Sequence, residues 1–112
     1  MNNLITQTNP LFGEVRFIKI GEKPYAVAND VAEKLGYSRP RKAVSDHCKG
    51  VLKQCLPTQG GVQEMSIIPE GDIYRLIIKS RLPQAEQFEK WVFDEVLPQI
   101  RPTWIYTNVR RR

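Results

Sequence analysis

Residues 30–44 of the chain, DVAEKLGYSRPRKAV, predict two short helices joined by a turn. Asp30, with a glutamate three residues later, has the form of a capping box, which places the start of the first helix at Asp30. Gly36 can take the left-handed conformation that often ends a helix. Ser38 is a suitable N-cap for the second helix, whose first turn tolerates Pro40. The stretch therefore predicts a helix, a short turn and a second helix.

The first turn of the second helix is basic, since it carries Arg39, Arg41 and Lys42. The positive end of a helix dipole disfavours cationic side chains. A bound phosphate would remove this penalty, because free backbone N–H groups and cationic side chains would converge on one anion. These side chains are therefore predicted to contact phosphate. The alternative is an ordinary solvated basic face.

The flanking segments predict β-hairpins. The second helix is expected to end near Lys49, with Gly50 as its C-terminal glycine. Strand-forming residues with turn residues between them occupy four segments, 14–20, 25–28, 51–56 and 62–68. Three apolar residues of the second hairpin are expected to face the core: Val62, Met65 and Ile67.

Two further helices are expected after the second hairpin. The apolar period changes from two to about 3.6 in DIYRLIIKS, residues 72–80. Pro83 is expected to open a last helix, and Pro98 and Pro102 to end regular helix. Its apolar stripe is expected in the core: Ala85, Phe88, Trp91, Val92 and Val96. The predicted class is α+β, a single domain of small antiparallel β-hairpins packed with about four helices.

The chain of 112 residues is long enough for one domain with one core and too short for two ordinary domains. Residues 1–11 are expected to form a flexible N-terminal arm, residues 12–104 the folded domain, and residues 105–112 a basic C-terminal tail. The sequence has neither an apolar run of about 18 residues nor a signal-peptide pattern. A cytoplasmic protein is therefore expected.

Catalytic and metal-binding patterns are missing from the sequence. The glycine pair at 60 and 61 lacks the lysine and hydroxyl residue of a phosphate-binding loop. His47 and Cys48 are sequence neighbours, so on a helix their side chains diverge by about 100° and form a poor nucleophilic dyad. Together with Cys55 they provide only three soft ligands, which cannot complete a four-coordinate zinc site without a carboxylate, and the two cysteines are expected to be free thiols. Neither enzyme activity nor a metal or other cofactor is expected.

The formal net charge of +5 favours an anionic partner, with double-stranded DNA first and an acidic protein surface second. The two short helices resemble the helix-turn-helix pattern, which offers the start of its second helix to the major groove. No third helix is predicted beside them, which weakens that interpretation. The residues predicted to contact DNA are Ser38, Arg39, Arg41, Lys42, Lys49, Lys53, Arg110, Arg111 and Arg112.

Three segments in order resemble the BRO N-terminal domain family, found in phage antirepressors and in baculovirus repeated-ORF proteins. The segments are DVAEKLGYSRPRKAVSDH, GGVQEMSIIPEGDIYRLIIKS and AEQFEKWVFDEVLPQIR. The helix motif of the family falls on Asp30, Val31, Ala32, Leu35, Gly36 and Tyr37. Its C-terminal motif falls on Trp91, Val92, Val96, Leu97, Pro98, Ile100 and Arg101. The resemblance covers residues 12–101 and transfers no catalytic residue.

The resemblance implies an α+β DNA-binding domain of a prophage or viral transcription regulator of the antirepressor type. The domain is often followed by a separate C-terminal domain in this family. Many relatives continue after the arginine with a short polar stretch that contains glycine, where this chain has Pro102, Thr103 and Trp104, and this departure leaves the effector function open. The alternative is a protein-interaction module that binds a phage repressor without touching DNA. Its interface would include exposed aromatic side chains such as Tyr37, Trp104 or Tyr106. A homo-oligomer is also left open.

Overall fold

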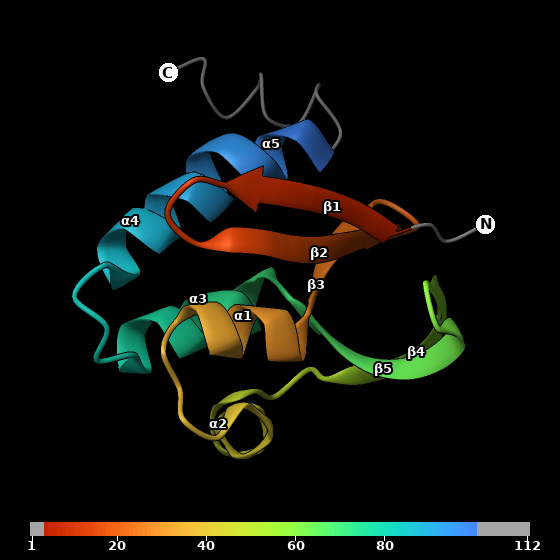
Figure 1. The fold of residues 1–112 in the computed structure, drawn as a ribbon, viewed down its shortest axis with the longest axis horizontal. Coiled ribbons are helices and arrows are strands. Elements are labelled where there is room, and N and C mark those ends of the chain that lie inside the picture. Colours follow the sequence, from red (N-terminus) through yellow and green to blue (C-terminus); the bar gives the residue numbers. More distant parts are fainter. Residues whose placement is uncertain (1–3, 101–112) are drawn as a thin grey trace.

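The computed structural model describes residues 4–100, and within them the strands form one five-stranded antiparallel sheet of order β1-β2-β3-β5-β4. The strands are β1 (Leu4–Asn9), β2 (Gly13–Ile20), β3 (Lys23–Val27), β4 (Leu52–Thr58) and β5 (Gly61–Pro69). The helices are α1 (Ala28–Lys34), α2 (Pro40–His47), α3 (Glu70–Lys79), α4 (Ala85–Lys90) and α5 (Leu97–Ile100), with a π-helical segment η1 (Trp91–Val96) between α4 and α5. The predicted α+β class is confirmed (Figure 1).

Both predicted hairpins are present, but they belong to one sheet. Strands β3 and β5 join them by antiparallel pairing, with Ala26 opposite Ile68. Strand β3 lies at the centre of the sheet and is buried along almost its whole length. Sequence patterns locate each hairpin because its strands are close in the chain, whereas the β3–β5 pairing is long-range and has no local signal.

The prediction of a flexible arm is wrong for residues 4–9. These residues form β1, which pairs antiparallel with β2 over its full length. The turn between the two strands is held by Asn9, whose Oδ1 accepts hydrogen bonds from the backbone N–H groups of Leu11 and Phe12 at 2.7 and 3.1 Å. The strand also packs Ile5 against the core.

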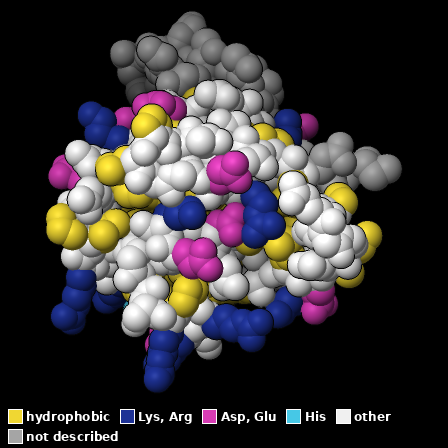
Figure 2. All heavy atoms as spheres, in the orientation of Figure 1, with side chains coloured by type: hydrophobic (Ala, Val, Ile, Leu, Met, Phe, Trp, Pro, Cys, Tyr) yellow, Lys and Arg dark blue, Asp and Glu magenta, His cyan; other side chains and the backbone are white. Residues whose placement is uncertain are grey.

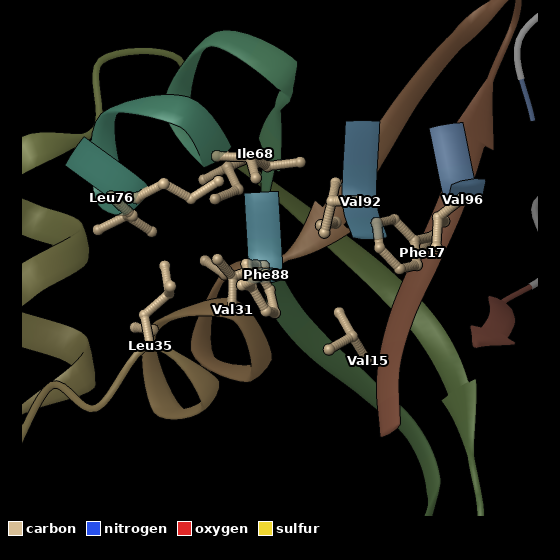
Figure 3. Packing of buried hydrophobic residues seen from close by; sticks show 14 of the residues in the cluster. Val15, Phe17, Val31, Leu35, Ile68, Leu76, Phe88, Val92 and Val96 are labelled. Carbon is tan, nitrogen blue, oxygen red and sulfur yellow. The ribbon is translucent and has the colours of Figure 1, made fainter. Parts of the chain in front are cut away.

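The main core lies between the helices and one face of the sheet (Figure 3). Phe17 of β2 lies beside Val92 and Val96 of the last helix, and on α1 Val31 lies close to Phe88. The buried members of the predicted last-helix stripe are Phe88, Trp91, Val92 and Val96, and Ala85 packs at its edge. This stripe is therefore structural, as its helical spacing predicts.

A second, smaller cluster covers the other face of the sheet. Its buried members are Ile18, Tyr25, Val27, Leu56 and Ile67. Of the three residues of the second hairpin expected in the core, Ile67 is buried and Met65 half-buried, but Val62 is 74% exposed. The prediction for Val62 is wrong because the β4–β5 hairpin extends beyond the helices at the right of Figure 1.

Helix α1 begins at Ala28, and the capping box predicted at Asp30 is wrong. Strand β3 leads into the helix directly, and no side chain caps its first turn. Asp30 lies inside that turn, and its carboxylate instead accepts hydrogen bonds from the backbone N–H and the guanidinium of Arg16 in β2. The predicted end is confirmed, since Gly36 has a φ of +85° in the left-handed region.

Helix α2 begins at Pro40, and its N-cap position is Arg39 instead of the predicted Ser38. The helix ends at His47, so Gly50 is not its C-terminal glycine. Close packing favours glycine at position 50, because a Cβ there would lie only 3.1 Å from Cγ of Pro69. The glycine lets the linker between α2 and β4 pass close to the start of α3.

The last helix begins at Ala85, two residues after Pro83, and continues through Pro98 into α5. The prediction that Pro98 ends the helix is wrong. A proline inside a helix removes one backbone donor and clashes with the preceding turn. The π-helical turn directly before it supplies a wider backbone path that accommodates the ring. Pro102 and the basic tail lie outside the described residues.

Candidate nucleic-acid interface

Helix α3 packs against both α1 and α2, so the prediction that no third helix supports this pair is wrong. The Tyr37 hydroxyl, in the turn between α1 and α2, donates a hydrogen bond to the backbone carbonyl of Leu76 at 2.7 Å. The Ser80 hydroxyl, just after α3, donates to the carbonyl of Leu35 at 2.7 Å. In Figure 1, α2 is seen end-on and α1 from the side, so the two helices cross steeply. The three helices form a helix-turn-helix-like unit into which the β4–β5 hairpin is inserted.

Helix α2 turns Ala43 and Val44 inward, where both are buried, and leaves its first turn in solvent. Arg39, Arg41 and Lys42 are all exposed. Figure 2 shows Lys and Arg side chains along the lower edge of this face, where Figure 1 places α2. The backbone around this turn is fixed from inside by the packing of the three helices.

The three cations of this turn are not equivalent. The Nζ of Lys42 lies 3.1 Å from Oδ2 of Asp46, one helical turn later, and forms an ion pair with it. Within residues 4–100, Arg39 and Arg41 form no ion pair. The two arginines therefore carry the uncompensated positive charge of the helix start.

A groove of about 760 Å³ separates α2 from the β4–β5 hairpin. It brings together two cations that the sequence predicted separately, Arg41 of α2 and Lys53 of β4. Further polar side chains line it as well: Asn29, Ser45, Gln63 and Ser66. Ser38 and Lys49, also predicted, are exposed outside the groove lining, and Arg110, Arg111 and Arg112 lie outside the described residues.

A buried carboxylate fixes the linker between α2 and β4. Asp72, fully buried in α3, accepts hydrogen bonds from the backbone N–H groups of Lys49 and Gly50 at 2.9 and 2.7 Å. It also forms an ion pair with Nη1 of Arg75 at 2.7 Å. From the sequence, Asp72 suits only the beginning of α3. Its role in the linker is non-local and has no signal in the neighbouring residues.

The groove is also lined by Arg16, whose charge is already matched by Asp30. Two nitrogens of the guanidinium bind the Asp30 carboxylate at 2.8 and 2.9 Å, and the backbone N–H of Arg16 binds it at 3.0 Å. The hydrogen bond to Asp30 raises the pKa of Arg16, although burial opposes this. The pairing of β2 with β3 ends at Phe17 and Ala26, and the N–H of Arg16, the preceding residue of β2, donates to Asp30.

Cys48 lies half-buried at the end of α2, and Cys55 is exposed in β4, both as free thiols. Burial raises the pKa of the Cys48 thiol to about 12, with the negative charge of Asp72 adding to the effect. At neutral pH this thiol is protonated and a poor nucleophile. Among residues 4–100, no three His, Cys, Asp or Glu side chains gather as a metal site, and no helix has the length and apolar character to cross a bilayer.

Tyr37 is not the exposed aromatic side chain that the protein-interaction alternative predicts. The side chain is half-buried, its hydroxyl binds α3, and its ring centroid lies 6.0 Å from that of His47. Burial raises the pKa of the hydroxyl, and the neighbouring Cys48 thiol adds to this. The other two candidates, Trp104 and Tyr106, lie outside the described residues.

Residues 14–98 match the family model for the BRO family, N-terminal domain. The chain belongs to this family. The resemblance drawn from the three sequence segments is thereby confirmed.

Similar curated proteins come from a bacterium and from viruses of invertebrates. An uncharacterized protein of Haemophilus influenzae is 60% identical over 79 residues, which are 69% of this chain and 39% of that protein. An uncharacterized Bro-N domain-containing protein, ORF2, of Autographa californica nuclear polyhedrosis virus is 31% identical over 99 residues, covering 71% of this chain and 30% of the viral protein. Putative Bro-N domain-containing protein 201R of Invertebrate iridescent virus 6 is 31% identical over 116 residues, which cover 84% of this chain and 28% of that protein. The chain thus spans well under half the length of these relatives, and no solved structure matches it.

Proposed function

We propose that this BRO domain binds duplex DNA through the start of α2, as part of a prophage or viral transcription regulator of the antirepressor type. The observation that carries the proposal is the pair Arg39 and Arg41. Both are exposed at the first turn of a helix braced by two others, and neither has a carboxylate partner within residues 4–100. A phosphate backbone is the polymer that such an uncompensated basic helix start fits best.

In this mechanism, α2 approaches the major groove with its first turn. An arginine is suited to a bidentate contact with guanine, and contacts to phosphate fix the orientation of the helix without reading sequence. Arg39 and Arg41 are the side chains placed for these contacts. Residues with a supporting role at phosphates are Ser38, Lys42, Lys49, Lys53 and the tail residues Arg110, Arg111 and Arg112.

The test is a double substitution, Arg39→Ala with Arg41→Ala, measured by fluorescence anisotropy on labelled duplex at several salt concentrations. We expect affinity to fall about ten-fold or more, and the slope of log K against log salt to become less negative by about 2. Thermal stability should change by less than about 0.5 kcal/mol, as for other exposed positions. The matched control removes the same charge from the β2–β3 hairpin, Lys19→Ala with Lys23→Ala. Equal affinity for the two double variants would refute the proposal.

The alternative, a repressor-binding module that does not touch DNA, is favoured by one feature of α3. Tyr74 and Ile78 lie one turn apart on this helix and are 46% and 57% exposed. The Tyr74 ring meets the ring of Phe93 with a centroid distance of 6.1 Å, which extends the apolar surface. Capture of a repressor that survives nuclease treatment and is lost in Tyr74→Ala with Ile78→Ala would support this alternative. Capture that disappears with nuclease supports DNA binding.

A further inference from the structure

We propose that the groove between α2 and the β4–β5 hairpin holds the sugar-phosphate backbone of one DNA strand, so that the hairpin is a second contact element beside the helix. This inference rests on the proposed function and extends it from the helix start to a site with two walls. The ligand chemistry is a phosphodiester chain held by side chains from both walls.

The two walls of the groove each supply a cation. Arg41 comes from α2 and Lys53 from β4, both are exposed, and neither forms an ion pair within residues 4–100. These residues belong to different elements, α2 and β4, yet they line one concave surface. Two cations facing one groove from opposite walls suit an extended anion that lies between them.

Neutral donors accompany these charges. Three residues of the groove lining have side chains that make no hydrogen bond within the described part of the chain: Asn29, Ser45 and Ser66. Hydroxyl and amide groups of this kind, together with Arg and Lys, supply most protein contacts to phosphate and sugar. The groove therefore offers several unused donors along its length in addition to its charges.

The charge balance distinguishes this groove from the concavity beside it. Of the described residues that line the groove, Glu64 alone is acidic; Arg16 is already paired with Asp30, so the unpaired cations of the lining are Arg41 and Lys53. The neighbouring concavity, between β1–β2 and the β4–β5 turn, has two carboxylates, Glu14 and Asp30, and two cations, Arg16 and Lys34. Only the first of the two has the net positive lining that an anionic polymer requires.

The groove is also held at a fixed width from inside the domain. Asp72 binds the backbone of Lys49 and Gly50, the linker between the two walls. Gly50 packs so closely on Pro69 that a Cβ would come within 3.1 Å. A site whose walls are already in place loses less conformational entropy when a ligand binds. The hairpin is thus positioned before DNA arrives.

The first test compares two charge reversals on exposed strand lysines, Lys53→Glu in the groove and Lys23→Glu at the β2–β3 turn. We expect Lys53→Glu to weaken duplex binding about ten-fold at moderate salt, since it loses a phosphate contact and adds repulsion. Lys23→Glu should change affinity by less than about two-fold, because its only effect is on long-range, screened charge. Equal weakening by the two variants overturns the inference.

The second test uses Cys55, which is exposed in β4 and needs no substitution. Because side chains alternate along a strand, Cys55 shares a face with Lys53, and its cross-strand partner is Glu64 of the groove lining. Saturating duplex should slow alkylation of Cys55 by N-ethylmaleimide, because a bound strand covers this face of the hairpin; the rate is measured by mass spectrometry of the peptide that contains Cys55. An unchanged rate at saturation overturns the inference.

The outcomes separate this inference from the proposed function. Duplex binding that depends on Arg39 and Arg41, with no special effect of Lys53→Glu, overturns the groove assignment and leaves the helix contact standing. A wild-type protein that binds no duplex at low salt overturns both. Protection of Cys55 by polyglutamate and not by duplex assigns the groove to an acidic protein surface and also overturns the inference.

Discussion

Four arginines of this domain, Arg16, Arg75, Arg39 and Arg41, lie in two regions with opposite chemistry. Inside, Arg16 and Arg75 bind the buried carboxylates of Asp30 and Asp72 at 2.8 and 2.7 Å. On the outer turn of α2, the arginines have no carboxylate partner within residues 4–100. The inner pairs hold backbone segments together, and the outer residues hold nothing within the domain. Positive charge in the first region stabilises the fold, whereas in the second it is available to a ligand.

The largest effect that this comparison predicts is at Asp72. Asp72→Ala would leave the backbone N–H groups of Lys49 and Gly50 without their acceptor and Arg75 without its partner. We expect the free energy of unfolding to fall by about 3 kcal/mol or more, measured by urea denaturation. Arg75→Ala is the control, and it should cost about 1 kcal/mol because the side chain of Arg75 is 42% exposed and the backbone bonds of Asp72 remain. Similar losses for the two variants would refute the role assigned to the carboxylate.

A smaller loss is expected at the other inner pair. Asp30→Asn keeps the shape of the side chain but removes the charge that faces Arg16, whose side chain is 31% exposed and partly hydrated. Stability should fall by about 1–2 kcal/mol, because charge-assisted hydrogen bonds become neutral ones. The measurement is again urea denaturation, beside Asp46→Asn as an exposed carboxylate of the same type. A loss no greater than that of Asp46→Asn would show that the inner pair contributes no more than a surface pair.

Local patterns in the sequence predict much of this fold. The two hairpins, the left-handed Gly36 and the buried stripe of the last helix follow from turn residues and periodicity, which act over a few residues. The missed features have two different causes. Strand β1 is next to β2 in the chain, but its polar residues at positions 6–9 do not form a strand pattern, and it is stabilised by pairing with β2. Helix α3 contacts the α1–α2 pair only after an intervening hairpin, and this contact has no local signal.

The candidate site shows the same division. The basic turn at Arg39, Arg41 and Lys42 is visible in the sequence, because charge and helix punctuation are local. Lys42 and Asp46 are one helical turn apart, so their i, i+4 spacing also predicts the ion pair between them. The groove that Arg41 and Lys53 both line could not be predicted from the sequence, because it depends on how the hairpin lies beside α2.

The smallest effect on stability is expected at Asp46. This carboxylate pairs with Lys42, so Lys42, like Arg16 and Arg75, has an intramolecular partner that Arg39 and Arg41 lack within residues 4–100. The side chains of Lys42 and Asp46 are 62% and 47% exposed, so their ion pair contributes only about 0.3–0.5 kcal/mol. Asp46→Ala should therefore leave the unfolding free energy within about 0.5 kcal/mol of the wild-type value.

DNA binding should respond to Asp46→Ala in the opposite direction to the arginine substitutions. Removing this carboxylate frees Lys42 for phosphate, so affinity should rise about two- to three-fold and the salt slope should become more negative by about 0.9. Glu86→Ala on α4 removes the same charge from another exposed helix position and should change neither quantity beyond screened, long-range effects. If both variants raise affinity equally, net charge alone governs binding, and the distinction between paired and unpaired cations on α2 has no functional meaning. A steeper salt slope for Asp46→Ala alone would show that Lys42 joins the interface once its intramolecular partner is gone.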